Sequence, residues 1–184
     1  MSVYFLMANG FEEAEAVVPA DLLRRAGADV KLALVADNAS GPAAVTGSHG
    51  LMLLTDMLAD NIDVKTADAI VLPGGTAGTA VLAASDTVLS LIEQAASNGR
   101  YICAICAAPS ILGSMKLLEG RKATCYPSFS KYLTGSIYTG ADVEKDDIFI
   151  TAKAAGAAFS FGLKIVETLY GTAVSDKIKG EIFY

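Results

Sequence analysis

The sequence has little of what several classes of protein require. Only three cysteines and one histidine occur among 184 residues, and so sparse and odd a number of cysteines fits a reducing compartment better than a disulfide scaffold. Basic residues are also scarce, because 14 lysines and arginines face 20 acidic residues and leave a net charge of −6. Such a chain has no basic surface to neutralise phosphates, so neither nucleic acid nor an anionic membrane is an expected partner.

Long apolar runs are absent as well, since none approaches the roughly 20 residues that a membrane-spanning helix needs. The opening stretch MSVYFLMANGFEE has neither a basic region nor a small-residue cleavage site, so it does not match a secretory signal. We therefore expect a cytoplasmic protein. With 53% hydrophobic and 18% charged residues, the chain is expected to fold as one globular domain over residues 1–184.

Short apolar runs alternate with amphipathic stretches along the chain. The runs lie at 2–8, 29–36, 68–73, 101–106 and 148–152. Helical spacing predicts helices over 12–26, 86–97 and 155–170, with Asp86 as the N-cap of the second. Strands without polar alternation, separated by helices, indicate a mostly parallel sheet covered on both faces. The predicted fold is an α/β three-layer sandwich, with a small antiparallel hairpin over 43–54.

Three segments follow predicted strands at the edge where sites form in such folds. They are NGFEEAE (9–15), PGGTAG (73–78) and Cys106. The glycine-rich segment could cradle a phosphate, but it lacks the G-x-G-x-x-G and GK[ST] signatures of nucleotide sites. Its backbone amides could instead form an oxyanion hole. No cofactor is expected.

Cys103 and Cys106 form an apparent C-x-x-C pair. Because 101–105 is predicted as a strand, their Cα atoms would lie about 10 Å apart and their side chains would point to opposite faces. A disulfide needs Cα atoms within about 7 Å. His49 is the only histidine, which disfavours a zinc site, so no metal is expected. Cys103 is interpreted as a small core residue.

Cys106 is set apart by the residues that follow it. Ala107, Ala108 and Pro109 describe a sharp strand-to-helix turn of the nucleophile-elbow kind, although the G-x-S-x-G signature is absent. The positive end of the helix dipole would lower the pKa of a thiol there and favour the thiolate. From these residues alone, a reactive thiol and an inert buried thiol are equally supported.

Glu15 is the second residue of interest. It lies close to the apolar stripe of the helix predicted over 12–26, whereas Glu12 and Glu13 suit a solvated first turn. Partial desolvation would raise the pKa of Glu15 and allow acid–base chemistry. From these residues alone, a solvated helix glutamate is nevertheless the favoured interpretation.

The motifs NGFEEAEAVVPADLLRRAG, AIVLPGG and AICAAPSILG, in this order and at these spacings, resemble the ThiJ/PfpI superfamily. The resemblance covers nearly the whole chain and is closest to the branch of the parkinsonism-associated protein "DJ-one" and its bacterial thiazole-annotated relatives. It implies a flavodoxin-like fold, also described as class I glutamine amidotransferase-like, and a homodimer. It also implies that Cys106 is the nucleophile, with Glu15 as a protonated carboxyl that hydrogen-bonds its sulfur. The backbone of Gly75 and Ala107 corresponds to the oxyanion donors, with Gly74 beside them.

At other positions the sequence either matches the family pattern or departs from it. Asp21 and Arg25 match a polar cluster near the dimer interface of relatives. His49 stands where relatives often carry an arginine, and Tyr126 stands where a histidine is common in the branch with glyoxalase and deglycase activity. Tyr126 could orient a substrate or fill the pocket, and we favour the second. Ala107 occupies the histidine position of the protease-like branch, which disfavours a peptidase.

Two functions follow from these residues and the resemblance. The first is a cysteine-dependent stress protein acting on reactive carbonyls, in which Cys106 attacks and Glu15 shuttles the proton. The alternative is a non-enzymatic oxidative-stress sensor or chaperone in which Cys106 oxidises to sulfinate. The missing histidine at position 126 shifts weight towards the sensor or towards weak activity. The expected partners are a small-molecule carbonyl or oxidant and a second copy of the chain.

Overall fold

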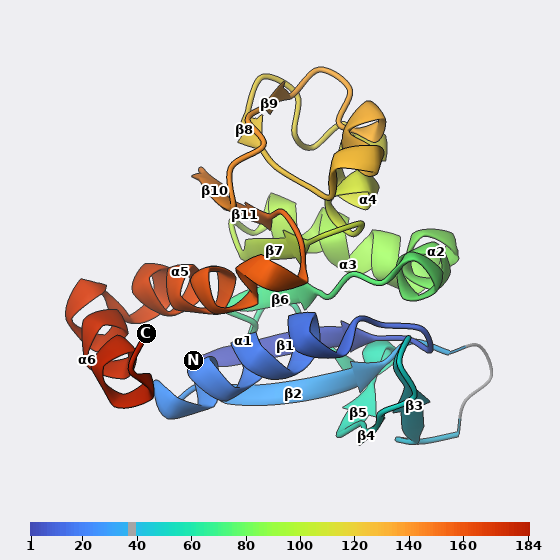
Figure 1. The fold of residues 1–184 in the computed structure, drawn as a ribbon. Helices are drawn as coiled ribbons and strands as arrows, with labels where there is room; N and C mark the ends of the chain where they lie inside the picture. Colours follow the sequence, from blue (N-terminus) through green and yellow to red (C-terminus); the bar gives the residue numbers. More distant parts are fainter. Residues whose placement is uncertain (37–39) are drawn as a thin grey trace.

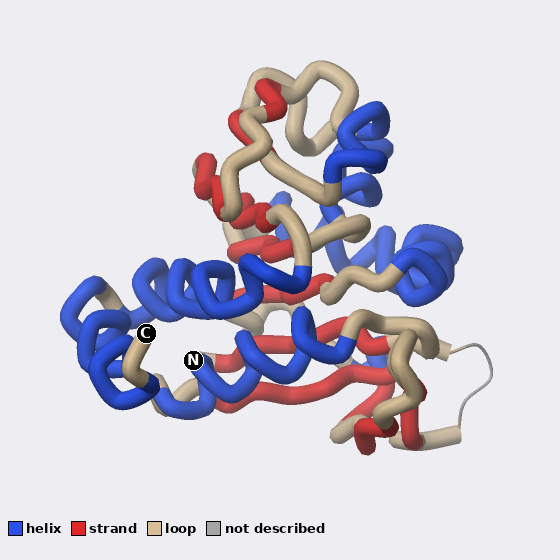
Figure 2. The backbone as a smooth tube through the Cα atoms, in the orientation of Figure 1, coloured by secondary structure: helices blue, strands red, loops and turns tan. Residues whose placement is uncertain are grey.

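The computed structural model describes residues 1–36 and 40–184, and it places a seven-stranded sheet between two layers of helices (Figures 1 and 2). The strand order is β10-β11-β7-β6-β1-β2-β5, and only the β10–β11 pair is antiparallel. The strands are β1 (Ser2–Met7), β2 (Asp29–Leu34), β5 (Met57–Leu58), β6 (Ala69–Leu72), β7 (Tyr101–Ile105), β10 (Val143–Asp146) and β11 (Phe149–Ala152). The predicted α/β fold with a mostly parallel sheet is confirmed.

Two short pairs of strands stand beside the main sheet. The predicted antiparallel hairpin is present as β3 (Ala44–Thr46) and β4 (Met52–Leu54). A second pair, β8 (Lys122–Ala123) with β9 (Ile137–Tyr138), is parallel and was not predicted. Strands of two residues carry too few side chains for an alternating pattern to be recognised.

The helices include α2 and α6, neither of which was predicted from the sequence. The helices are α1 (Glu13–Arg25), α2 (Thr76–Ala84), α3 (Asp86–Ser97), α4 (Pro109–Ser114), α5 (Ala158–Tyr170) and α6 (Thr172–Ile182), with 3-10 turns η1 (Ala59–Asn61), η2 (Pro127–Tyr132) and η3 (Ala155–Ala157). The expected N-cap of α3 is wrong by one position. Ser85 precedes the helix, and its hydroxyl accepts a hydrogen bond from the Val88 N–H at 3.4 Å, which makes Asp86 the first helical residue.

The core is divided by the sheet into two apolar layers. Strand residues such as Phe5 and Val71 pack with α1 and α5 on one face, and Leu6 and Ile70 pack with α3 on the other. All four residues of β6 are buried, as expected of a parallel strand covered on both sides. Within the described ranges, none of the helices combines the length and the apolar character that crossing a bilayer takes.

Candidate active site

Cys106 follows β7 directly and has a φ of 64°, in the left-handed region that residues other than glycine rarely occupy. Its N–H donates to the Ala152 carbonyl at 2.9 Å, and its own carbonyl accepts from the Tyr126 N–H at 2.8 Å. Neighbouring segments therefore hold the backbone on both sides, which is how a strained conformation persists. The sharp strand-to-helix turn is the one that the sequence indicates, with α4 beginning at Pro109.

The apparent C-x-x-C pair is not a disulfide, because Cys103, Cys106 and Cys125 are all free thiols. Cys103 is fully buried in the layer formed with α1 and α5, as expected of a core residue. Cys106 packs against that same layer, so the expectation of opposite faces is wrong. The positive φ of Cys106 interrupts the strand before the alternation of side chains reaches it.

Glu15 is completely buried in the first turn of α1, so the interpretation as a solvated helix glutamate is wrong. Its Oε2 accepts a hydrogen bond from the Gly74 N–H at 3.0 Å, and its Oε1 is buried without a hydrogen-bond partner among the described residues. Burial raises the pKa of Glu15 to about 7, and the charge of Glu12 adds to the increase. The neighbouring Cys106 thiol and the Gly74 N–H lower this pKa, but they do not outweigh burial.

The pKa of Cys106 shifts in the direction opposite to the one expected from the helix dipole. Burial and the negative charge of Glu15 raise it to about 12, although the N–H groups of Gly75 and Ala107 lower it. The helix that follows, α4, has only six residues. Its dipole would lower the pKa of the thiol, but the Glu15 carboxylate close to the sulfur raises it. Glu15 and Cys106 are therefore a coupled pair in which a charge on one group disfavours a charge on the other.

Two glycines allow the loop after β6 to pass between α1 and the elbow. A Cβ atom on Gly74 would lie 2.6 Å from the Cys106 Cβ and 2.8 Å from the Ile105 carbonyl oxygen. Gly75 has a φ of 88°, and a Cβ atom there would lie 2.7 Å from the Glu12 nitrogen. The Gly-Gly sequence thus brings backbone N–H groups against both Glu15 and Cys106, where a side chain would not fit.

His49 lies in the turn between β3 and β4, where it meets the start of α1. Its Nδ1 is 2.9 Å from Glu13 Oε2 and 3.5 Å from Glu12 Oε1. Glu13 is buried, which corrects the expectation of a solvated first turn. Burial raises the pKa of Glu13, but hydrogen bonds from the His49 side chain and from the N–H groups of His49 and Leu51 outweigh it and hold the value at about 2.

The remaining predicted residues take different places. Tyr126 adjoins the elbow through its backbone, and its side chain is 46% exposed. Asp21 and Arg25 form an exposed ion pair of 2.7 Å along α1. Asp21 also borders an apolar cavity of about 260 Å³ that Leu53 of the hairpin helps to line. Within the described residues, no hydrogen bond joins Asp21 or Arg25 to the Glu15–Cys106 pair.

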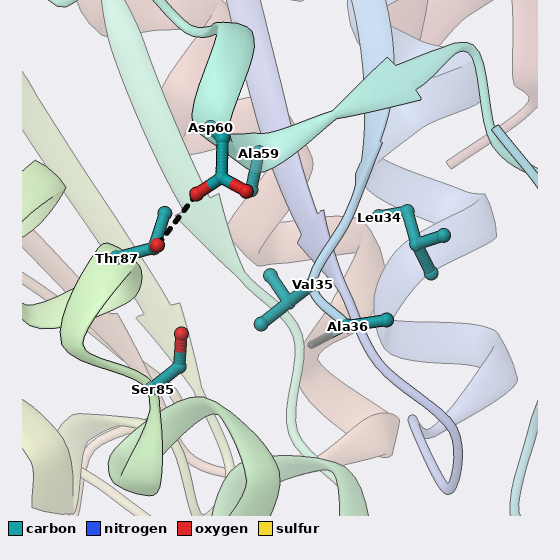
Figure 3. Close-up of a pocket in the computed structure, with 7 residues that line it drawn as sticks. All are labelled: Leu34, Val35, Ala36, Ala59, Asp60, Ser85 and Thr87. Atoms are coloured by element: carbon teal, nitrogen blue, oxygen red, sulfur yellow. Dashed lines mark hydrogen bonds between the residues drawn. The ribbon is translucent and has the colours of Figure 1, made fainter. Parts of the chain in front are cut away.

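A further cavity, of about 300 Å³, lies away from the predicted site residues. It is lined by Val35 directly after β2, by Asp60 of η1 and by Ser85 and Thr87 at the start of α3. The Thr87 hydroxyl donates a hydrogen bond of 2.6 Å to Asp60, and both side chains can be followed in Figure 3. Because Cys106 and Glu15 take no part in its lining, this cavity is not part of the candidate active site.

The chain is similar to known proteins both in sequence and in fold. A family profile described as DJ-1/PfpI family matches residues 1–168. Protein dj-1beta of Drosophila melanogaster is 36% identical over 173 residues, which span 92% of this chain and 90% of the relative. The crystal structure of Drosophila melanogaster DJ-1beta superposes with a TM-score of 0.90 at 33% identity, covering 99% of this chain and 97% of the other.

Two further relatives carry functional names. Deglycase PH1704 of Pyrococcus horikoshii is 30% identical over 171 residues, spanning 92% of this chain and 99% of the relative. Glutathione-independent glyoxalase DJR-1.2 of Caenorhabditis elegans is 35% identical over 162 residues, spanning 87% of this chain and 83% of the relative. Both names describe chemistry on reactive carbonyl compounds or their adducts.

Proposed function

The chain belongs to the DJ-1/PfpI family, and on that premise we propose that it is a cysteine-dependent stress protein that acts on small reactive carbonyls. The observation that carries the proposal is the buried Glu15 carboxyl beside the Cys106 thiol, with a pKa of about 7. An acid–base group is most effective when its pKa lies near the working pH. The names of the Pyrococcus and Caenorhabditis relatives support carbonyl chemistry of this class.

In the proposed reaction, Glu15 in its carboxylate form accepts the proton of the Cys106 thiol. The high pKa of Cys106 means that little thiolate is present at rest, so proton removal accompanies attack on the substrate. As the sulfur bonds to the aldehyde carbon, the π bond of the carbonyl breaks and its electron pair moves to oxygen. Glu15 then returns the proton to that oxygen, and a hemithioacetal results with no change in charge.

The N–H groups of Gly75 and Ala107 provide the polar environment for this step. Both interact with the Cys106 sulfur and lower the pKa of the thiol, so both are close to the reacting centre. Once the sulfur has bonded to the carbonyl carbon, these N–H groups can donate hydrogen bonds to the former carbonyl oxygen, which gains negative charge. We assign them the role of oxyanion donors, which in enzymes is commonly worth a factor of about 10² to 10³ each.

With methylglyoxal as the substrate, the catalytic cycle is completed without an added oxidant or reductant. In the hemithioacetal, Glu15 removes the proton from the former aldehyde carbon and returns it to the adjacent carbon through an enediol. The product is a thioester of lactate on Cys106. Water then breaks the carbon–sulfur bond, which releases lactate and restores the thiol, so the net change is the addition of one water molecule.

The alternative function is an oxidative-stress sensor or chaperone in which Cys106 itself is the reactant. Peroxide would convert the thiol to a sulfenic acid and a second peroxide would convert that to a sulfinate, each step releasing one water. The partial exposure of Cys106, beside the buried Glu15 and two N–H donors, favours such a product. A protonated Glu15 could donate a hydrogen bond to one sulfinate oxygen through the unpartnered Oε1.

One experiment separates the two functions. Lactate formation from methylglyoxal is measured for the wild-type protein, for Cys106→Ser and Glu15→Gln, and for Cys103→Ser as a matched cysteine control. We expect turnover in the wild type and in Cys103→Ser, and a loss of about 100-fold or more in the other two variants. Wild-type turnover no higher than that of Cys106→Ser, together with stoichiometric oxidation of Cys106 by peroxide, would reject the enzyme and leave the sensor.

The oligomeric state and the cellular location of the protein are also proposed. A homodimer is inferred from the family resemblance, and sedimentation of the purified protein tests it. A cytoplasmic location is proposed because three cysteines, a small and odd number, fit a reducing compartment, and fractionation of cells tests that. The roles of Asp21 and Arg25 at a dimer interface stay predictions until the assembly is determined.

A further inference from the structure

A second group of ionisable side chains lies where the turn of the β3–β4 hairpin meets the start of α1. It consists of Glu12, Glu13 and His49, each of which offers a ligand atom within 4.8 Å of the other two. None of the three touches the reacting atoms, although the charge of Glu12 contributes to the raised pKa of Glu15. We propose that Glu12, Glu13 and His49 bind a divalent first-row transition-metal ion of the Zn²⁺ class.

The separations between the donor atoms fit such an ion. His49 Nδ1 lies 2.9 Å from Glu13 Oε2 and 3.5 Å from Glu12 Oε1. Nitrogen and oxygen ligands bind zinc at about 2.0–2.2 Å in a tetrahedral arrangement, so two ligands of one ion are roughly 3.3–3.6 Å apart. The His49–Glu12 distance already fits this range, and His49 Nδ1 needs to move by only a few tenths of an ångström from Glu13 Oε2.

The Glu13 carboxylate is held in place independently of any ion. Its Oε1 accepts hydrogen bonds from the backbone N–H groups of His49 at 2.7 Å and of Leu51 at 3.4 Å. A side chain at Gly47 would overlap the carboxylate, so the turn closes tightly around it. These bonds fix the carboxylate while Oε2 faces His49, and support of this kind is typical of preorganised metal ligands.

The charge of the group gives a second, independent reason for a cation. The Glu13 side chain is only 9% exposed, so a charge on its carboxylate is poorly solvated by water. Within the described part of the chain, the ion pairs of Glu12 and Glu13 are both with His49, which is 70% exposed and is charged only when protonated. No lysine or arginine there supplies a permanent countercharge, and buried carboxylates are normally paired or bound to a metal.

The chemistry of the donors selects the class of ion. One imidazole nitrogen and two carboxylate oxygens suit borderline ions such as Zn²⁺, whereas Mg²⁺ and Ca²⁺ favour oxygen ligands alone. The Ser48 hydroxyl lies 3.1 Å from Glu12 Oε2 and 3.2 Å from His49 Nδ1, so it is close enough to support a bound water in the fourth position. From histidine and cysteine ligands alone the sequence predicts no metal, and the site proposed here departs from that expectation.

The test is a calorimetric titration of the tag-free, metal-stripped protein with Zn²⁺. Co²⁺ is then used as a spectroscopic substitute, with the imidazole proton resonances recorded. Because His49 is the only histidine of the chain, those resonances report on this side chain alone. We expect one Zn²⁺ per chain and a paramagnetic shift of the His49 resonances with Co²⁺.

Variants identify the ligands. Losing even a supporting partner of a metal ligand usually weakens binding about 10–100-fold. Loss of a ligand itself in His49→Gln or Glu12→Gln should therefore weaken Zn²⁺ binding at least tenfold. Glu93→Gln, which changes an exposed carboxylate on α3, should leave the affinity unchanged. Cys106→Ser should also leave it unchanged, because the thiol is not part of this group.

The proposal is overturned if wild-type protein binds no stoichiometric Zn²⁺. It is equally overturned if His49→Gln binds as tightly as the wild type, or if Cys106→Ser abolishes binding, since the thiol would then be the ligand. None of these readouts depends on turnover, so they stand apart from the test of the proposed carbonyl chemistry.

Discussion

The Glu15 carboxyl and the Cys106 thiol act in opposite directions on one another's ionisation. The charge of Glu15 raises the pKa of Cys106, whereas the Cys106 thiol lowers the pKa of Glu15. A thiol stabilises a neighbouring carboxylate by donating to it, and a carboxylate repels a thiolate. The pair therefore carries its first negative charge on Glu15, and Cys106 loses its proton most readily to Glu15 itself.

Replacement of Glu15 by glutamine should change how stability depends on pH. The pKa of Glu15 is raised from 4.5 to about 7 in the folded protein, so the folded state binds more protons than the unfolded state between these values. Its contribution to stability is fully present below about pH 4.5 and is lost as the pH rises through 7. Removing the charge should make Glu15→Gln more stable than the wild type at pH 8, by at most about 3 kcal/mol.

Urea unfolding of both proteins at pH 4.5 and pH 8 measures this difference. Glutamine keeps a carbonyl oxygen for the Gly74 N–H, so the two proteins should have nearly equal stability at the lower pH. A stability difference that does not change with pH would show that Glu15 is not an elevated-pKa carboxyl. Glu93→Gln, at an exposed position, serves as the control.

Oxidation by peroxide should be confined to Cys106. Cys103 and Cys125 are fully buried. Burial raises the pKa of all three thiols, so access to the sulfur and not its thiolate content distinguishes Cys106. Reactivity towards peroxide requires thiolate character and access, and of the three only Cys106 is partly exposed. Mass spectrometry of peptides after mild peroxide should find added oxygen on Cys106 alone, and an equal yield on Cys103 would contradict the structure.

The sheet could be predicted because each buried parallel strand is a local run of apolar residues. The run over 68–73 corresponds to β6 (Ala69–Leu72), and that over 148–152 corresponds to β11 (Phe149–Ala152). Helix α2 was missed because TAGTAVLAA is apolar almost throughout, so no single face stands out. The antiparallel strand β10 contains three consecutive charged residues and is paired only by β11, so it has no buried apolar run to recognise.

The candidate site was predictable only in part, because its properties depend on segments distant in the sequence. The turn at Cys106 is local and was recognised from its small residues. The burial of Glu15 arises from the loop at Gly74, which a helical periodicity cannot reveal. The raised pKa of Cys106 arises from the same long-range contact, so the local dipole argument gave the wrong direction.

Substitution of Gly75 by alanine should impair both folding and thiol reactivity. A residue other than glycine is strained at a φ of 88°, and the added Cβ would meet the Glu12 nitrogen at 2.7 Å. We expect a loss of at least about 2 kcal/mol of stability. Alkylation of Cys106 should also be altered, because the Gly75 N–H interacts with its sulfur.

Gly180→Ala is the matched control for that substitution. Gly180 lies in α6, and a Cβ atom there would meet nothing within 4 Å. Alanine should stabilise the helix by roughly 0.5–1 kcal/mol and leave Cys106 unaffected. Thermal unfolding and the alkylation rate are measured for both variants. Equal behaviour of the two would contradict the close approach at Gly75.

Replacement of Glu13 by glutamine should destabilise the protein at neutral pH. The pKa of Glu13 is lowered to about 2, so its carboxylate stabilises the fold above about pH 4.5, and this contribution is lost as the pH falls through 2. Hydrogen bonds to a charged group are worth about 1.5–3 kcal/mol, and we expect a loss of that order at pH 7. Urea unfolding at pH 7 and pH 3 should show a smaller difference at the lower pH, and a constant difference would contradict the assignment.

Tyr126 can be tested with two substitutions that keep its backbone hydrogen bond to Cys106. The hydroxyl of Tyr126 has no hydrogen-bond partner among the described residues, and the side chain is 46% exposed. Tyr126→Phe should therefore keep methylglyoxal turnover within about twofold, whereas a tenfold loss would mean that the hydroxyl orients the substrate.

Tyr126→His adds a group whose ordinary pKa is about 6.5, at the position where the family resemblance leads us to expect a histidine. If proton transfer limits turnover, an imidazole beside the elbow supplies a second acid–base group, and kcat should rise. The rise should be confined to the pH range in which the imidazole titrates, so the pH profile of kcat gains an inflection that Tyr126→Phe lacks. A uniform change at every pH would indicate altered packing instead, because a side chain that only fills space has no proton to exchange.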